Sequence, residues 1–370
     1  MKLLIFGDIC PTSDYRELFN RGEELFCNVA DLLRSSDYAV CNLECPATDS
    51  VNKTIKTGPS LKAEKKDIKT LAKLGFKAIS IANNHILDYG YKGVIDTLES
   101  AEESGMAVFG GGRNLDDAAK PFFAEIGGKK IGFLSFAEHE FNIATRNTPG
   151  ANLFDPYISL KQIKNAAELC DFLVVLYHGG IEHYKYPSEL LQKKCRSMVD
   201  FGANLVVCQH SHCIGTYELY SGATIVYGQG NSVFGYSKGD DAWNEGLIIE
   251  LDLDDNYSIQ YHLIKAAEKG ISINENSDRL AEFHKDSAML ADKKFLVDSF
   301  SAFCKKRASL DLPLFFGKSR IFIKLNRILK GKLFNPSKRV AMITHNLIRC
   351  DAWNEVLQED LDSIYRSKSM

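Results

Sequence analysis

Residues 77–110 read KAISIANNHILDYGYKGVIDTLESAEESGMAVFG. The stretch begins with a short apolar run, Lys77 to Ala82, and ends with a second, Ala107 to Gly110. Between them, Tyr91 to Ser104 carries apolar side chains at helical spacing. A strand, a helix and another strand in this order are typical of a βαβ unit with parallel strands.

The same alternation covers roughly the first 210 residues. Strands are expected at residues 2–7, 38–43, 77–82, 107–110, 131–136, 172–177 and 204–208, and helices at 23–34, 64–74, 91–104, 159–168 and 188–201. From Thr224 to Lys265 three further strands follow with little helix between them, at 225–227, 246–253 and 258–264. The pattern therefore predicts an α/β protein whose sheet system ends in an antiparallel section.

After about residue 266 the pattern becomes helical, so we expect a domain over 1–265 and a helical C-terminal region over 266–370. Within the latter, residues 305–339 hold eleven Lys and Arg against one acid, Asp311. Apolar residues recur at helical spacing from Phe315 to Phe334, with basic residues on the opposite side. This segment either lies on an anionic membrane or packs on a core with its basic face in water.

The composition is that of an ordinary globular protein. Of the 370 residues, 45% are hydrophobic and 25% are charged, and the net charge is −3, so nucleic acid is not an expected partner. The first residues do not resemble a secretory signal, and no run approaches the roughly 18 apolar residues of a membrane span. We expect a cytoplasmic protein, with any membrane contact peripheral, at the inner membrane face, and with its ten cysteines reduced.

Polar side chains follow five of the expected strands. They are Asp8, then Asn42 and Glu44, then Asn83, Asn84 and His85, then His178, and finally His210 and His212. Because the carboxyl ends of parallel strands form the ligand-binding edge of an α/β sheet, we expect these clusters to converge. Carboxylates mixed with imidazoles suit Zn, Mn or Fe rather than Ca or Mg. The sequence thus predicts a metal site at this edge.

The order and wording of these clusters resemble a known family. Gly-Asp at 7–8, Asn-Leu-Glu at 42–44, Ala-Asn-Asn-His at 82–85 with Asp-Tyr-Gly after it, His-Gly-Gly-Ile-Glu at 178–182, His-Ser-His at 210–212 and Gly-Gln-Gly-Asn at 228–231 are similar to the capsule-synthesis CapA family, within the calcineurin-like metallophosphoesterases. The resemblance covers roughly residues 1–250. It implies a four-layer α/β/β/α sandwich of the metallophosphatase type, here with a C-terminal helical appendage.

The resemblance also implies roles for individual residues. Two divalent metal ions, Mn, Fe or Zn, would be held by Asp8, Glu44, Asn84, His178, His210 and His212, with Glu44 bridging. His85 would be the catalytic acid that protonates the leaving group. Glu44 stands where phosphoesterases have Asp, and Gln209 where a Gly usually precedes the His-x-His pair.

Four further residues are candidates near the site. Cys10 stands where phosphoesterases have a His, so it is either a thiolate ligand or a buried apolar thiol. Glu182 and His183 either contact substrate beside His178 or begin an exposed helix, and Glu138 is a candidate for the substrate side.

The expected metal site favours a metal-dependent hydrolase, a phosphoesterase or a gamma-glutamyl amidohydrolase. The resemblance to the CapA family implies that it would act on a phosphoester or an anionic polymer during synthesis of a capsule or other surface polymer, such as poly-gamma-glutamate or an exopolysaccharide. The alternative is a non-catalytic accessory protein that binds an anionic polymer or precursor, with residues 305–339 docking a membrane synthase. Fold alone does not decide between them.

Overall fold

The computed structural model describes residues 1–12, 15–56, 58–254, 257–303, 320–331 and 333. Its first sheet has the strand order β16-β15-β14-β1-β2-β3-β4, with β13 paired to β1. The strands are β1 (Lys2–Ile9), β2 (Tyr38–Leu43), β3 (Ala78–Ser80), β4 (Ala107–Phe109), β13 (Asn231–Val233), β14 (Glu245–Asp252), β15 (Ser258–Ala267) and β16 (Gly270–Ile273). β1 to β4 run parallel, and β14, β15 and β16 extend the sheet antiparallel, which confirms the expected antiparallel section.

The second sheet has the order β11-β12-β10-β9-β7-β6. Its strands are β6 (Phe122–Ile126), β7 (Lys129–Ala137), β9 (Phe172–His178), β10 (Leu205–Gln209), β11 (Tyr217–Tyr220) and β12 (Ala223–Val226). The four central strands are parallel and the two edge strands antiparallel. A separate two-stranded ribbon joins β5 (Gly111–Gly112) and β8 (Gly150–Ala151).

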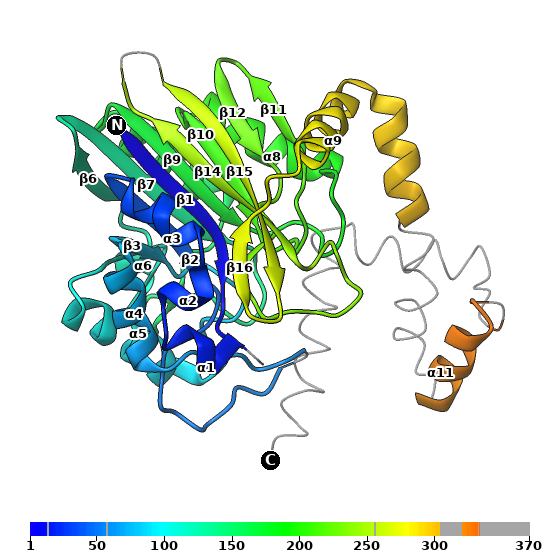
Figure 1. Ribbon diagram of the computed structural model, residues 1–370, viewed down its shortest axis with the longest axis horizontal. Helices are drawn as coiled ribbons and strands as arrows, with labels where there is room; N and C mark the ends of the chain where they lie inside the picture. The colour runs from blue at the N-terminus through cyan, green and yellow to red at the C-terminus, as the bar shows by residue number, and fades with distance from the viewer. Residues whose placement is uncertain (13–14, 57, 255–256, 304–319, 332, 334–370) are drawn as a thin grey trace. The chain divides into compact units, whose positions relative to one another are not determined.

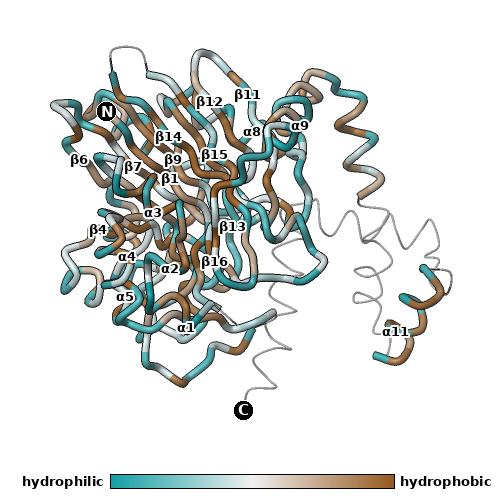
Figure 2. Tube along the Cα trace, in the orientation of Figure 1, coloured by the Kyte–Doolittle hydropathy of each residue, from teal (hydrophilic) through white to brown (hydrophobic). Residues whose placement is uncertain are grey.

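The two sheets pack face to face because each strand alternates its side chains between two apolar surroundings. Leu3 and Ile5 of β1 belong to the same buried cluster as Phe133 of β7 and Val174 of β9, so this cluster fills the space between the sheets. Leu4 of β1 points the other way, into a cluster that includes helical residues. Buried on both faces, the central strands read as nearly continuous apolar runs, and Figure 2 shows hydrophobic residues concentrated along them.

Helices cover the outer face of each sheet (Figure 1). On the first sheet, α3 (Val29–Arg34), α4 (Lys65–Leu74) and α5 (Gly90–Glu103) contribute buried residues to the outer cluster, and on the second sheet α7 (Pro156–Ala167) and α8 (Glu189–Asp200) do the same. Shorter helices are α1 (Tyr15–Phe19), α2 (Glu23–Phe26) and α6 (Leu115–Ala118). The order helix, sheet, sheet, helix is the four-layer α/β/β/α sandwich that the family resemblance implied.

The chain divides into two compact units, Met1–Leu296 and Val297–Met370. The first unit therefore reaches beyond residue 265, where the sequence pattern placed the domain boundary. Two elements account for the difference. β16 pairs with β15, and α9 (Ser277–Ala288) packs on the sandwich through Phe283, which is 1% exposed. The short helix η1 (Met289–Ala291) follows α9. β16 also interrupts the region expected to be wholly helical after residue 266.

In the second unit, α11 (Arg320–Ile328) lies within the basic segment 305–339, and most of the rest of that segment is outside the described residues. Among the helices that are described, none combines the length and the apolar character needed to cross a bilayer.

Candidate metal centre

Both sheets deliver polar side chains to one place. Asp8 lies near the end of β1, in register with Asn42 of β2, and Glu44 follows β2 directly. His178 ends β9 in register with Gln209, the residue before His210. The carboxyl ends of the parallel strands thus meet at one edge of the sandwich, where α/β proteins bind ligands.

All six expected ligands are buried. Their exposed fractions are 0% for Asp8 and Glu44, 8% for Asn84, 2% for His178, 6% for His210 and 7% for His212. Buried charges and imidazoles are costly unless they are paired or coordinate a metal. The partners of each group therefore decide what the site can do.

Asp8 and His178 are connected through Asn42. Asn42 Nδ2 donates to Asp8 Oδ1 at 2.7 Å and lies 3.1 Å from His178 Nδ1. On the other side of its ring, His178 Nε2 lies 3.0 Å from Asn84 Oδ1. The backbone N–H of His210 donates to Asp8 Oδ2 at 3.0 Å. These bonds hold the two sheets' contributions together.

Glu44 is the exception in this network. Both of its carboxylate oxygens are buried without a hydrogen-bond partner. Its Oε1 lies 3.5 Å from His178 Nε2 and 3.9 Å from His212 Nε2. An unsatisfied buried carboxylate is rare in folded proteins and calls for an explanation such as a bound ion.

A divalent ion fits this arrangement. Two groups of ligand atoms lie within 4.8 Å of one another: Glu44 with His178 and His210, and Glu44 with Asp8 and His212. Glu44 belongs to both groups. The donors are carboxylate oxygens and imidazole nitrogens, the set that Zn, Mn and Fe accept. The buried His, Glu and Asp side chains are therefore compatible with divalent metal binding.

The electrostatics of the imidazoles agree with this chemistry. Burial lowers the pKa of His178 to about 4, and burial together with the neighbouring imidazoles lowers the pKa of His210 to about 3. Both rings are then neutral at pH 7, as a metal ligand must be. Burial, reinforced by the Asp8 carboxylate, raises the pKa of Glu44 well above its usual range. For His212 burial acts to lower the pKa, but the Glu44 and Asp8 carboxylates outweigh it and raise the pKa.

The loop after β10 is held in an uncommon backbone conformation. His210 and His212 have φ values of 89° and 50°, in the left-handed region that residues other than glycine seldom adopt. Such conformations cost about 1–3 kcal/mol each and cluster at functional sites. His212 Nδ1 lies 2.9 Å from Asn231 Oδ1 of β13. Asn231 closes the Gly-Gln-Gly-Asn stretch, but the sequence did not indicate this contact.

His85 lies in a second buried cluster beside the candidate ligands. Its Nδ1 lies 2.6 Å from Asp88 Oδ2, which also accepts the backbone N–H of Leu61 at 2.7 Å. Asp88 forms an ion pair with Lys56, whose Nζ is 3.2 Å from the same ring nitrogen. Lys56 was not foreseen, because only the fold shows that its side chain is 5% exposed.

Cys10 belongs to neither group of ligand atoms. Its side chain is 0% exposed and belongs to the apolar cluster between the first sheet and its helices. Burial and the adjacent Cys45 thiol raise the pKa of Cys10 well above its usual range. Of the two roles left open by the sequence, the buried apolar thiol is the one that this position favours.

The expected substrate-side residues lie in different settings. Glu182 Oε1 is 3.9 Å from His210 Nε2, as is Glu140 Oε1, and both carboxylates are partly exposed. The His183 ring lies beside His212, with ring centroids 6.2 Å apart. Glu138 instead accepts a hydrogen bond from the Tyr177 hydroxyl at 2.6 Å and pairs with Lys194 at 3.0 Å. Glu138 is thus already paired with two protein groups.

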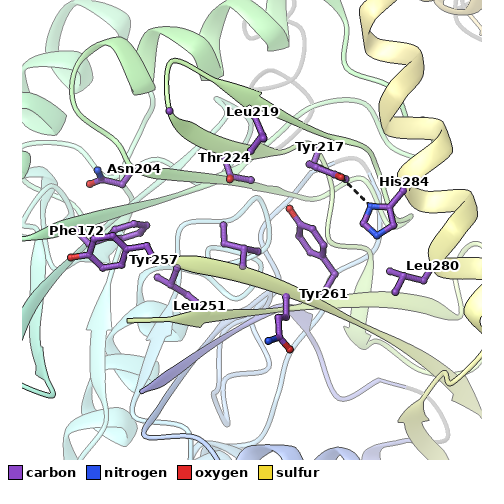
Figure 3. A pocket seen from close by; sticks show the side chains of 13 residues that line it. Phe172, Asn204, Tyr217, Leu219, Thr224, Leu251, Tyr257, Tyr261, Leu280 and His284 are labelled. Atoms are coloured by element: carbon purple, nitrogen blue, oxygen red, sulfur yellow. Dashed lines mark hydrogen bonds between the residues drawn. The ribbon is translucent and has the colours of Figure 1, made fainter. Parts of the chain in front are cut away.

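A separate cavity of about 660 Å³ contains none of the candidate site residues. It lies between β11, β15 and α9, and its lining includes Tyr217, Tyr257, Tyr261 and His284 (Figure 3). The Tyr217 hydroxyl is 3.0 Å from His284 Nδ1.

Comparison with known proteins gives a family match. Residues 2–236 match the model of the family described as "Bacterial capsule synthesis protein PGA_cap". The chain is 30% identical to the "Capsule biosynthesis protein CapA" of Bacillus anthracis over 71% of this chain and 64% of that protein. It is 32% identical to the "PGA biosynthesis protein CapA" of Bacillus subtilis (strain 168), over 66% of this chain and 62% of that protein.

A third similar protein is more distant. It is the "Probable polyglutamine synthesis accessory protein MT0602" of Mycobacterium tuberculosis (strain CDC 1551 / Oshkosh), 26% identical over 55% of this chain and 57% of that protein. The chain thus spans less than two thirds of the length of each of these curated relatives.

Proposed function

The chain belongs to the bacterial capsule synthesis protein family PGA_cap, and from this premise we propose that it is a metal-dependent hydrolase acting in the synthesis of a capsule or other surface polymer. The substrate class that we propose is a phosphoester or the gamma-glutamyl linkage of an anionic polymer such as poly-gamma-glutamate.

The observation that carries this proposal is the state of Glu44. Its carboxylate is 0% exposed, and neither oxygen has a hydrogen-bond partner, while Asp8 and three imidazoles surround it. Without a cation, this arrangement places two carboxylates close together in a low-dielectric interior. A divalent pair would compensate the charge, so the buried carboxylates support a metal-binding role.

The residues that would hold two ions are Asp8, Glu44, Asn84, His178, His210 and His212, with Glu44 shared because it belongs to both groups of ligand atoms. When bound, the ions would act as Lewis acids and lower the pKa of water toward neutrality. The chain's own contribution is to keep His178 and His210 neutral by burial and to fix the His178 ring between Asn42 and Asn84.

His85 would supply the proton that a leaving group needs. Asp88 accepts from its Nδ1, which orients the ring and leaves Nε2 as the proton-donating atom. Asp88 is in turn held by Lys56 and by the backbone of Leu61. We assign Asp88 and Lys56 as positioning residues that act through His85.

Metal content and turnover together test this proposal. The protein purified without chelators should contain about two equivalents of Mn, Fe or Zn per chain by elemental mass spectrometry, the number expected if Glu44 bridges two ions. It should hydrolyse bis(p-nitrophenyl) phosphate or shorten poly-gamma-glutamate. A chain that stays metal-free after incubation with each metal, and that converts neither compound, would contradict the proposal.

One observation favours a non-catalytic second candidate. Cys10, at a position where phosphoesterases have a His, is buried in the apolar cluster and belongs to neither ligand group. The site then has one ligand fewer than a phosphoesterase, and the Mycobacterium relative is named an accessory protein. In this candidate the site binds an anionic polymer or precursor, and the C-terminal region docks a membrane synthase. Metal uptake without turnover, with tight binding of poly-gamma-glutamate, would support it.

A further inference from the structure

Helix α11 exposes an apolar face. Ile321, Leu325 and Ile328 follow each other at intervals of four and three residues, which places them on one side of the helix. Their exposed fractions are 73%, 46% and 67%. Leu329 and Leu333, just beyond the helix, are 44% and 45% exposed. A helix that packs on a core would bury these side chains, but among the residues that the structure describes none covers the apolar face of α11.

The side of α11 next to this apolar face is basic. Arg320, Lys324 and Arg327 are separated by four and three residues, and all three are exposed. The sequence from Leu312 to Cys350 contains nine Lys and Arg residues and no Asp or Glu. No acidic side chain within this stretch can neutralise the basic face. Its charge is therefore complementary to an anionic surface.

We propose that α11 binds the surface of an anionic lipid bilayer, with its apolar face among the lipid chains and its basic residues at the phosphate headgroups. A helix with an exposed apolar face bordered by a Lys- and Arg-rich face is suited to lie in a bilayer interface, because long basic side chains can reach the headgroups. A soluble polyanion such as poly-gamma-glutamate would satisfy the basic side but would leave Ile321 and Ile328 in water. The two exposed faces together favour lipid over polymer.

The inference is independent of the metal centre, so it is tested on binding alone. The full chain is sedimented with phosphatidylcholine vesicles that contain either no anionic lipid or about one third phosphatidylglycerol, at low and high salt. We expect binding only to the anionic vesicles, and weaker binding at high salt because counterions screen the basic residues.

Two variants separate the faces of α11. Ile321→Asn combined with Ile328→Asn removes the apolar face, and Lys324→Gln combined with Arg327→Gln removes two charges. Each should weaken partitioning into anionic vesicles about tenfold or more. The control is Leu190→Asn, which replaces another aliphatic side chain, 68% exposed on α8, and should bind as the wild type does. Circular dichroism confirms that each variant keeps its fold.

Several outcomes would overturn the proposal. The first is that the wild type does not bind vesicles, or binds neutral and anionic vesicles equally. The second is that the Ile321→Asn/Ile328→Asn variant binds anionic vesicles like the wild type. The polymer alternative is checked in the same experiment by adding soluble poly-gamma-glutamate. Retention of the polymer by the wild type and by the Asn variant, with no vesicle binding by either, would assign the basic face to a polyanion instead.

Discussion

Replacing Glu44 with Gln should change the stability of the protein in opposite directions with and without metal. Glu44 is 0% exposed, and no protein group in the described part of the chain donates a hydrogen bond to either of its oxygens. A buried polar group without a partner costs about 1–3 kcal/mol, and a charged one costs more. Gln keeps the shape of the side chain and is still a buried polar group, so the variant relieves only the additional cost of a charge beside Asp8. We therefore expect metal-free Glu44→Gln to be more stable than the metal-free wild type by about 1–3 kcal/mol.

In the presence of metal the order should reverse. A ligand at 100 times its Kd stabilises the folded state by about 2.7 kcal/mol per site. Glu44 belongs to both groups of ligand atoms, so its loss should weaken both sites. The variant then forfeits this stabilisation, and the wild type becomes the more stable protein.

The assay is thermal unfolding of both proteins in EDTA and in excess Mn²⁺ or Zn²⁺. For a unit of nearly 300 residues, 1 kcal/mol corresponds to about 2 °C in Tm. We expect the Tm of Glu44→Gln to be about 2–6 °C above that of the wild type in EDTA and below it in metal. Glu125→Gln, an exposed carboxylate of β6, is the control and should follow the wild type in both buffers. A metal-free variant no more stable than the wild type would show that the buried charge is not under strain, and our reasoning would fail.

Three further results are expected. His85→Ala should keep its metal and lower turnover by about 10²–10⁴-fold, as the loss of a general acid does. His212→Ala should lose both turnover and metal. Elemental analysis and initial rates distinguish the two variants. Glu250 is 2% exposed; burial acts to raise its pKa, but ion pairs with two basic side chains outweigh burial and lower the pKa. The carboxylate therefore stabilises the folded state above pH 4.5, the ordinary pKa of Glu, and this contribution is lost as the pH falls through the lower pKa of the folded protein. Denaturant titrations should show the wild type losing its advantage over Glu250→Gln between pH 6 and pH 3; a difference that does not change with pH would count against the ion pairs. Phe283→Ala should cost about 3–5 kcal/mol, because this ring anchors α9 to the sandwich against Tyr261; a loss below 1 kcal/mol would place α9 outside the cooperative unit.

The layered fold was predictable because its signals are local. The strand expected at 38–43 coincides with β2, and the helix expected at 188–201 differs from α8 by one residue at each end. Both follow from periodicity that packing then reinforces. β16 was missed because four residues are too few to distinguish a strand from the helical pattern around them. Only its pairing with β15, across a sharp turn, defines it.

The candidate site was predictable in its residue types and less so in its contacts. Asp8, Glu44 and the histidines stand out because they end apolar runs. The sequence could not show that Cys10 is not among them. Side chains of a regular strand alternate with period two, which would put Cys10 on the same side as Asp8. The pairing of β1 with β13 shifts register between Asp8 and Ile9, and the Cys10 side chain lies in the helix-covered cluster instead. The burial of Lys56 likewise depends on the surrounding fold.

Since the site is built from both sheets, we expect its assembly to be a late event in folding. Asp8 accepts a hydrogen bond from a residue 202 positions further along the chain, and His212 contacts Asn231, on the strand that pairs with β1. During translation, Asp8 is therefore synthesised long before His210 and His212, the histidines that lie near it in the folded protein. Until β10 and β13 have been synthesised and placed, no stretch of the polypeptide brings these groups together. Metal uptake should consequently report on the docking of the two sheets, and kinetic measurements of metal capture during refolding would time that docking directly.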